Sequence, residues 1–402
     1  MTSAANSAAA PVAAAPAPFR PPLLSRALLL RLVSVVAVTV SFFLLLSAVP
    51  THAGRGAAGL ATGALMLSTV LGELAGPRIL GRRGHRGPLA AGLFLLGAPA
   101  LALPLDDGLA WTASMCLVRG LGFGLTMVAG GALTAALIPA ERRGEGLALV
   151  GVVGGVPSLV TLPLGVWMSE HLGYTALTTT AGLAALAAIP TVAALREVRP
   201  SDTPESPVVS ADTRALGMVA AIRAPGLRRP TSVFFATALA AGILVTFLPL
   251  AVPHASAGIA TMALLMQSTA STAARYAAGR YGDRRGAGQL VTPALLASAA
   301  GLSMLVATAS PVAVLTGAAL FGTGFGVAQN ATLTLMYGRV SRPSYGTVSA
   351  LWNLAYDGGM GIGAAGFSLL TAHTGYAWGF ALTALLMLTA LGPATRDRRS
   401  TP

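Results

Sequence analysis

The stretch that decides the fold reads Gly279-Arg280-Tyr281-Gly282-Asp283-Arg284-Arg285-Gly286, a charged loop between two long apolar runs. A related stretch stands 202 positions earlier and reads Pro77-Arg78-Ile79-Leu80-Gly81-Arg82-Arg83-Gly84. The arginines and the last glycine agree between the two copies, whereas Gly81 stands where the second copy has Asp283. Two copies of one loop indicate a chain built from two related halves.

The same offset continues beyond the loop without a gap. Gly120-Leu121-Gly122-Phe123-Gly124 aligns with Gly322-Thr323-Gly324-Phe325-Gly326. His171, Gly173 and Tyr174 align with His373, Gly375 and Tyr376. Glycine matches alone would be weak in a chain with 48 glycines, but arginine, histidine and tyrosine agree in the same register. We therefore expect two halves with the same fold and orientation, which is the parallel repeat of two-bundle transporters.

The composition predicts a protein that crosses the membrane many times. Of 402 residues, 54% are hydrophobic and 10% are charged, with a mean hydropathy of +0.72. A soluble chain carries roughly a quarter of charged residues, so this surface is expected to face lipid. The net charge of +13 comes from arginines in short loops, so we expect no nucleic-acid partner. The single Cys116 excludes an internal disulfide, and the sequence has no metal-ligand spacing.

Apolar runs long enough to span the hydrocarbon core predict twelve helices. Arginines crowd the loops on one side of them, whereas the other side carries Asp106, Asp107 and Glu170, with Arg55 as its only arginine. This asymmetry predicts that both termini are cytoplasmic. The runs lie near 32–49, 56–76, 88–105, 111–138, 146–168, 174–195, 231–252, 256–277, 288–309, 311–337, 347–370 and 375–392.

The polar stretches divide the chain into five parts. Residues 1–22 are rich in alanine, proline and serine and predict a disordered cytoplasmic tail. Residues 196–230 read as a cytoplasmic linker, with a short helix on the inner membrane surface around 213–223. The linker separates a six-helix bundle at 23–195 from another at 231–393, and 394–402 forms a second cytoplasmic tail. The predicted fold class is an all-α membrane protein of two pseudo-symmetric six-helix bundles.

The charged loop resembles a signature of the major facilitator superfamily. Residues 279–286 match its Gly-x-x-x-Asp-Arg-x-Gly pattern between helices 8 and 9, and the earlier copy lies between helices 2 and 3. Arg119 and the glycines after it resemble the helix 4 motif of this family, and helix 5 loosely resembles the glycine and proline pattern of drug–proton antiporters. The resemblance implies a cytoplasmic gate, latched by Asp283 in the second copy only. Its residues are Gly279, Asp283, Arg284, Arg285, Gly286, Arg78, Arg82, Arg83 and Gly84.

Two acidic residues fall inside predicted helices, where an ionisable group is costly and therefore a functional candidate. Asp357 lies near the middle of helix 11, with Asn353 one turn away, and is a candidate for proton coupling or for binding a substrate cation. The alternative is a structural acid. The resemblance places Arg119 at the central cavity, which suggests electrostatic coupling to Asp357. The alternative is that Arg119 snorkels outward or bonds to the backbone. Glu73 aligns with Arg275, and we expect these two residues to form a gating or structural pair across the interface.

The resemblance also implies that helices 1, 4, 7 and 10 line the substrate cavity. Few acids or bases occur there, which favours a fairly apolar, neutral or weakly charged ligand. The polar residues that we expect to line it are Ser34, Thr39, Ser41, Thr126, Thr246, Gln329 and Asn330.

These features predict a secondary active transporter of the plasma membrane, most simply one that exports a small apolar drug or metabolite against a proton gradient. The alternatives are proton-linked uptake of a nutrient and a non-transporting membrane sensor or scaffold. No enzyme signature or nucleotide-binding loop occurs, so we expect no catalytic residue, no metal and no cofactor, with the proton gradient as the energy source. We expect a bacterial protein that acts as a monomer, with a small-molecule substrate and membrane lipids as its partners.

Overall fold

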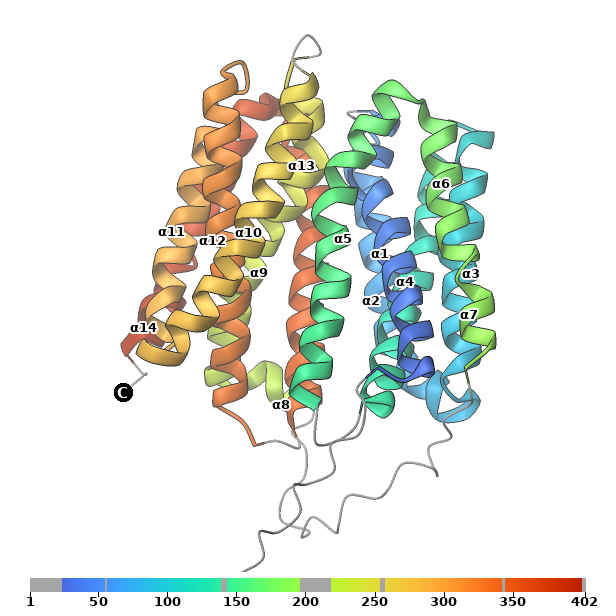
Figure 1. The fold of residues 1–402 in the computed structure, drawn as a ribbon. Coiled ribbons are helices and arrows are strands. Elements are labelled where there is room, and N and C mark those ends of the chain that lie inside the picture. Colours follow the sequence, from blue (N-terminus) through green and yellow to red (C-terminus); the bar gives the residue numbers. More distant parts are fainter. Residues whose placement is uncertain are drawn as a thin grey trace, which may run out of the picture.

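The computed structural model describes residues 24–54, 56–138, 143–195, 218–253, 257–341 and 344–399. Within these residues the chain forms helices and no strand. Two bundles of long helices stand side by side. In the view of Figure 1, α5 of the first bundle and α13 of the second lie where the bundles meet. We call the end at which α1 begins and α14 ends the terminal end, and the other the opposite end.

The first bundle contains five unbroken spans and one broken span. The break falls before Pro190, which cannot donate the backbone hydrogen bond that would continue the helix. At the start of the bundle, the Ser25 hydroxyl accepts a hydrogen bond from the Leu28 amide and caps α1. The elements are α1 (Arg26–Ala53), α2 (Ala58–Arg83), α3 (Arg86–Ala102), the short η1 (Leu103–Leu105), α4 (Leu109–Leu137), α5 (Arg143–His171), α6 (Tyr174–Leu186) and α7 (Ile189–Ala193).

The second bundle follows a short helix, α8 (Met218–Arg223), which lies across its terminal end (Figure 1). Ala221 of α8 packs with Leu227 and Val348 in a small apolar cluster. The long helices are α9 (Pro225–Ala251), α10 (Ala257–Arg285), α11 (Gly288–Met304), α12 (Pro311–Gly338) and α13 (Tyr345–Leu388), and α14 (Leu391–Arg399) extends the last of them. α13 contains two spans, because Gly375 breaks the helical geometry with φ 75° and ψ 170°.

The predicted twelve spans agree with these helices. By length and composition, nine segments in the described part of the chain suit a membrane crossing, and the last of them holds both spans around Gly375. α10 is long enough but carries a polar face, and α11 is short at 17 residues. Adding these two helices gives the expected number.

Packing within the two halves confirms the repeat. A Cβ at Gly120 of α4 would overlap the backbone carbonyl of Leu65, and one at Gly322 of α12 would overlap that of Gln267. Leu65 and Gln267 are themselves 202 positions apart. In the same way, a Cβ at Gly124 would overlap the carbonyl of Thr69, and one at Gly326 would overlap that of Ser271. The aligned glycines therefore let α2 touch α4 and α10 touch α12 at equivalent places.

The charged stretches differ from the predicted loops, because most of their residues are helical. α2 continues to Arg83 and α10 to Arg285, and only the glycines that follow leave the helix. Gly84 and Gly286 have φ of 70° and 85°, a conformation that glycine adopts without steric cost. The signature is thus a helix terminus with its last turn of arginines. The start of α9 also differs, since it lies at Pro225 rather than 231.

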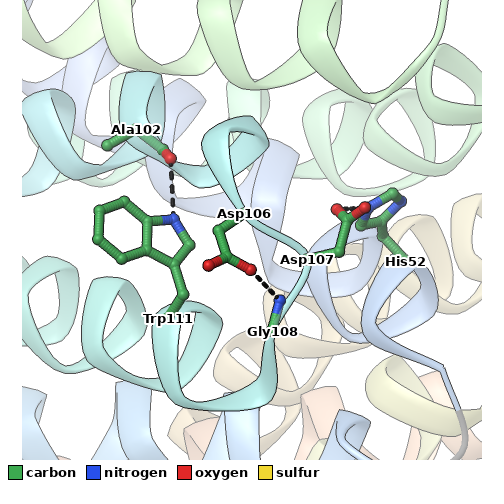
Figure 2. A network of polar contacts seen from close by, with 6 residues as sticks. All are labelled: His52, Ala102, Asp106, Asp107, Gly108 and Trp111. Carbon is green, nitrogen blue, oxygen red and sulfur yellow. Dashed lines mark hydrogen bonds and ion pairs between the residues drawn. The ribbon is translucent and has the colours of Figure 1, made fainter.

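Polar contacts brace the opposite end of the first half (Figure 2). His52 Nε2, near the end of α1, lies 3.1 Å from Asp107 Oδ1, and its ring stacks on Tyr174 of α6. Asp106 Oδ1 accepts from the amide of Gly108, and Trp111 donates to the carbonyl of Ala102. These contacts join α1 to α6 and to the connection between α3 and α4.

Candidate functional site

A cavity of about 710 Å³ lies between the two halves. Helices α1 and α5 of the first half and α9, α10, α12 and α13 of the second contribute to its wall. Along α10 the lining runs from Gln267 to Arg280, which is the half of that helix nearest the terminal end. The cavity therefore extends from the middle of the molecule toward the terminal end.

The two walls of this cavity differ in polarity. On the first half, the one polar side chain among the lining residues is Ser158, and its hydroxyl donates to the carbonyl of Gly155 in its own helix. The other side chains there are Phe43, Leu46, Val152, Val156, Leu159 and Leu162. The second half supplies the polar wall, with Gln267, Ser268, Ser271, Thr272, Arg275, Tyr276, Arg280, Gln329, Asn330 and Tyr356.

A hydrogen bond joins the polar wall across α10 and α12. Arg275 Nη1 donates to Gln329 Oε1 over 3.2 Å. The guanidinium of Arg280 lies 5.9 Å from the ring centre of Tyr276. The two arginines are the only charged residues among the described residues that line the cavity.

The two halves meet closely at the opposite end. The Ser47 hydroxyl of α1 donates to the carbonyl of Val245 in α9 over 2.7 Å. The hydroxyls of Thr62 in α2 and Thr246 in α9 lie 3.1 Å apart. A Cβ at Gly59 of α2 would overlap the carbonyl of Ala364 in α13. Direct contacts therefore close the opposite end, and the cavity lies on the terminal side of them.

A second polar site lies where α2 packs against α13, an interface that we call the α2–α13 seam. Asp357 of α13 is only 5% exposed and interacts electrostatically with Glu73 of α2. Glu73 and Asn353 line a smaller cavity of about 260 Å³ in this seam. The structure thus brings together Asp357, Asn353 and Glu73, one from the first half and two from the second.

The expected pair of Glu73 with Arg275 is not formed. The hydrogen-bond partner of Arg275 is Gln329, and the described residues contain no ion pair between Arg275 and Glu73. The repeat explains this difference. α2 packs on α13 in one seam, and its counterpart α10 packs on α5 in the other. Equivalent positions therefore lie in different seams.

Arg119 does not reach Asp357 and instead lies fully inside the first half. Its Nη2 donates to the carbonyl of Ser41 over 2.9 Å and its Nε to that of Leu96 over 3.3 Å. The residue is 1% exposed. Its place in this structure matches the alternative considered from the sequence, in which the guanidinium bonds to the backbone.

Of the seven polar residues expected at the cavity, Gln329 and Asn330 line it. Ser34 accepts from Arg31 Nη1, Thr126 donates to the carbonyl of Phe123, and Thr246 faces Thr62 at the closed end. Ser41 is buried beside Arg119. Thr39 lies close to α5, since a Cβ added at Gly154 would be 4.0 Å from Thr39 Oγ1.

Sequence reasoning missed most of the polar wall, which comes from α10. A repeating pattern could have found it: Gln267, Ser271 and Arg275 stand four residues apart, and Ser268, Thr272 and Tyr276 follow the same spacing. In a helix this spacing puts the side chains on one face.

The gate residues lie at the terminal end of each half. Arg78, Arg82 and Arg83 are exposed on the last turns of α2. On α10, Arg284 and Arg285 are exposed, and the Arg285 guanidinium lies 5.4 Å from the ring centre of Tyr281. The side chain of Asp283, the expected latch, lies outside the described residues. Residues 196–217 of the predicted linker also lie outside the described residues.

No group of three histidine, cysteine or acidic side chains among the described residues is arranged to hold a metal ion. The arrangement offers instead a ligand cavity shared by two bundles, together with the carboxyl groups of Asp357 and Glu73 where the bundles meet.

Comparisons with known proteins agree with this arrangement. The model of the Major Facilitator Superfamily matches residues 27–364. The crystal structure of the nucleoside transporter NupG superposes with a TM-score of 0.71 at 10% identity, covering 93% of this chain and 99% of that chain. A bacterial homologue of the human lysosomal transporter Spinster, solved in an inward-facing and unoccupied conformation, gives 0.70 at 13% identity, covering 93% and 96%. No curated protein matches the sequence.

Proposed function

The chain belongs to the major facilitator superfamily, and on this premise we propose that it exports a small organic compound across the plasma membrane in exchange for protons. It is a multi-pass membrane protein and a transporter, not an enzyme. The proposal concerns the energy source, the direction and the site.

The observation that carries the proposal is the carboxyl pair in the α2–α13 seam. Asp357 and Glu73 belong to different halves and interact electrostatically, with Asp357 buried and Glu73 half-buried. Two ionised carboxylates there repel each other, and binding of one proton relieves the repulsion. A rocking motion of one half against the other would change this pairing, which supports coupling of proton binding to the conformational change.

The charge distribution supports the orientation. Arg78, Arg82 and Arg83 lie at the terminal end with Arg284 and Arg285, whereas Asp106 and Asp107 lie at the opposite end. Basic residues favour the cytoplasmic side. The terminal end is therefore cytoplasmic in this proposal, and the cavity receives its ligand from the cytoplasm, as export requires.

A transport assay with inverted membrane vesicles tests this function. Vesicles that contain the protein are energised with a pH gradient and offered a panel of radiolabelled apolar metabolites and drugs. We expect accumulation of at least one compound, lost when a protonophore dissipates the gradient. Asp357→Asn should abolish gradient-driven accumulation but retain exchange of labelled for unlabelled compound, because the cavity itself is unchanged.

Asp106→Asn is the matched control, since this acid is exposed at the opposite end and an asparagine oxygen can still accept from the amide of Gly108. It should accumulate the compound as the wild type does. Accumulation by Asp357→Asn at the wild-type rate would exclude the coupling role. Movement only down the compound's own gradient would exclude proton-driven export.

A further inference from the structure

We propose that the cavity binds an amphipathic organic anion, with its charged group at Arg275 and its apolar body against α1 and α5. This inference rests on the proposed function only in taking the cavity as the transport site. It also replaces the neutral or weakly charged ligand expected from the sequence with one of defined charge.

The charge of the cavity is the first reason. Arg275 and Arg280 line it, and no acidic side chain does so among the described residues. The carboxyl groups of Asp357 and Glu73 belong to the α2–α13 seam, where Glu73 lines a different cavity. A cationic ligand would therefore meet a wall of its own sign, whereas an anion would meet an opposite charge.

The free bonding capacity of Arg275 is the second reason. A guanidinium carries five N–H donors, and the one described acceptor of Arg275 is the neutral Gln329 Oε1. Arg280 likewise has one described acceptor, the hydroxyl of Tyr276 at 3.5 Å, and its guanidinium also lies over the ring of that tyrosine. In the described part of the chain Arg275 has no carboxylate within ion-pair distance.

The neighbours of Arg275 add further donors. Gln329 uses its oxygen to accept from Arg275, and Asn330 uses its oxygen to accept from Thr334. Both amide NH₂ groups therefore remain as donors, and both residues line the cavity. Several N–H groups around one cation form a site suited to the oxygens of a carboxylate, phosphate or sulfonate.

Closure of the cavity would favour an anion. Arg275 is exposed in this structure. If the halves rock and shut the terminal end, Arg275 would lose water, and a buried unpaired cation is costly. A bound anion offsets this cost, whereas a neutral ligand does not. The facing wall, from Phe43 and Leu46 to Leu159, offers apolar contact and almost no hydrogen-bonding groups. The ligand is therefore expected to carry its charge at one end of an apolar body.

A binding measurement tests the charge class without any gradient. The full chain is placed in lipid nanodiscs, and empty nanodiscs give the background. The probes are dansylaminoundecanoic acid, its primary amide, and an amine with the same dansyl-alkyl body, all followed by fluorescence. We expect the acid to bind at least about tenfold more tightly than the amide, as one charge-assisted hydrogen-bonded contact would give.

Variants at Arg275 locate the effect. Arg275→Gln should weaken binding of the acid by about tenfold or more and leave the amide unchanged. Arg275→Lys should retain part of the preference, which shows that the site still folds. Arg228→Gln, an exposed arginine at the start of α9 outside the cavity, is the control and should bind as the wild type does.

Equal binding of acid and amide, tighter binding of the amine, or no saturable binding of the acid would overturn the proposal. So would an unchanged preference in Arg275→Gln. Displacement of the acid probe by naphthoate would indicate a water-soluble ligand, and displacement by a lysophosphatidate would indicate a ligand from the bilayer. Either result supports an anionic ligand. If neither compound displaces the probe, the proposal is overturned. Because no gradient is involved, a protein that binds the acid but fails the vesicle assay keeps this inference and loses proton coupling.

Discussion

At the scale of single residues, glycines of the repeat stand at several of the closest approaches between helices. Gly120 of α4 lies against the backbone of Leu65 in α2, where an added methyl group has no space. Gly120→Ala should therefore push α4 from α2 and lower the free energy of unfolding by about 1–3 kcal/mol. Thermal unfolding of the purified protein in detergent measures this change.

The same helix supplies the control. Gly131 of α4 is exposed, and an added Cβ there meets nothing within 4 Å. Gly131→Ala should leave the melting temperature unchanged or raise it, because alanine favours the helix by about 1 kcal/mol. If both variants melt alike, the glycine at 120 is not a packing requirement.

Arg119 shows at this scale where sequence reasoning reaches its limit. The motif identified the residue as unusual, and it is one of the largest fully buried side chains. Its partners are the carbonyls of Ser41 and Leu96. Backbone carbonyls are present in every helix, so nothing in the sequence indicates which ones a buried guanidinium will meet.

At the scale of helices, the charged signature acts as a helix end. α10 continues through Arg284 and Arg285 and stops at Gly286, whose φ is 85°. Gly286→Ala would place a side chain in the left-handed region at a cost of about 1–2 kcal/mol. We expect the last turn of α10 to fray, with faster hydrogen exchange of the amides in residues 279–285 and a small loss of global stability.

Gly282→Ala is the comparison for this prediction, because Gly282 is helical and an added Cβ would be 3.6 Å from its nearest neighbour in Ala287. It should slow exchange in the same segment or leave it unchanged. Faster exchange in Gly282→Ala than in Gly286→Ala would contradict the capping role.

The helices themselves were largely predictable from the sequence. Apolar runs and the repeat predicted the twelve spans, since a membrane-spanning helix needs about 20 predominantly apolar residues. The ends were harder to predict, because arginines at 82–83 and 284–285 look like loop residues although a helix can carry them beyond the membrane. α10 shows the same difficulty on one face, where Gln267, Ser271 and Arg275 are polar because they meet the cavity.

At the scale of the whole molecule, the missing information concerned which helices meet across the two halves. A repeat in sequence aligns Glu73 with Arg275, but it does not say that α2 packs on α13 while α10 packs on α5. The carboxyl pair of Glu73 with Asp357 follows only from that arrangement. Glu73 and Arg275 are equivalent in the repeat but lie in different seams. The two seams therefore differ in chemistry, because one contains an acid where the other contains an arginine.

The contacts at the opposite end predict how the whole molecule can be stopped. The hydroxyls of Thr62 and Thr246 are 3.1 Å apart across the two halves. Thr62→Cys combined with Thr246→Cys, in a Cys116→Ala background, should form a disulfide under oxidation, because the two side chains already converge. The bond would hold the opposite end shut while the cavity stays open at the terminal end.

If the halves must separate at the opposite end to release the ligand, oxidation should abolish transport and a reductant should restore it. Binding of the dansyl acid should persist in the oxidised protein, since Arg275 and its cavity lie on the terminal side of the bond. Each single cysteine variant, treated with the same oxidant, should transport normally and serves as the control. Undiminished transport by the cross-linked protein, with the disulfide verified by mass spectrometry, would exclude opening between α2 and α9 as a step in the cycle.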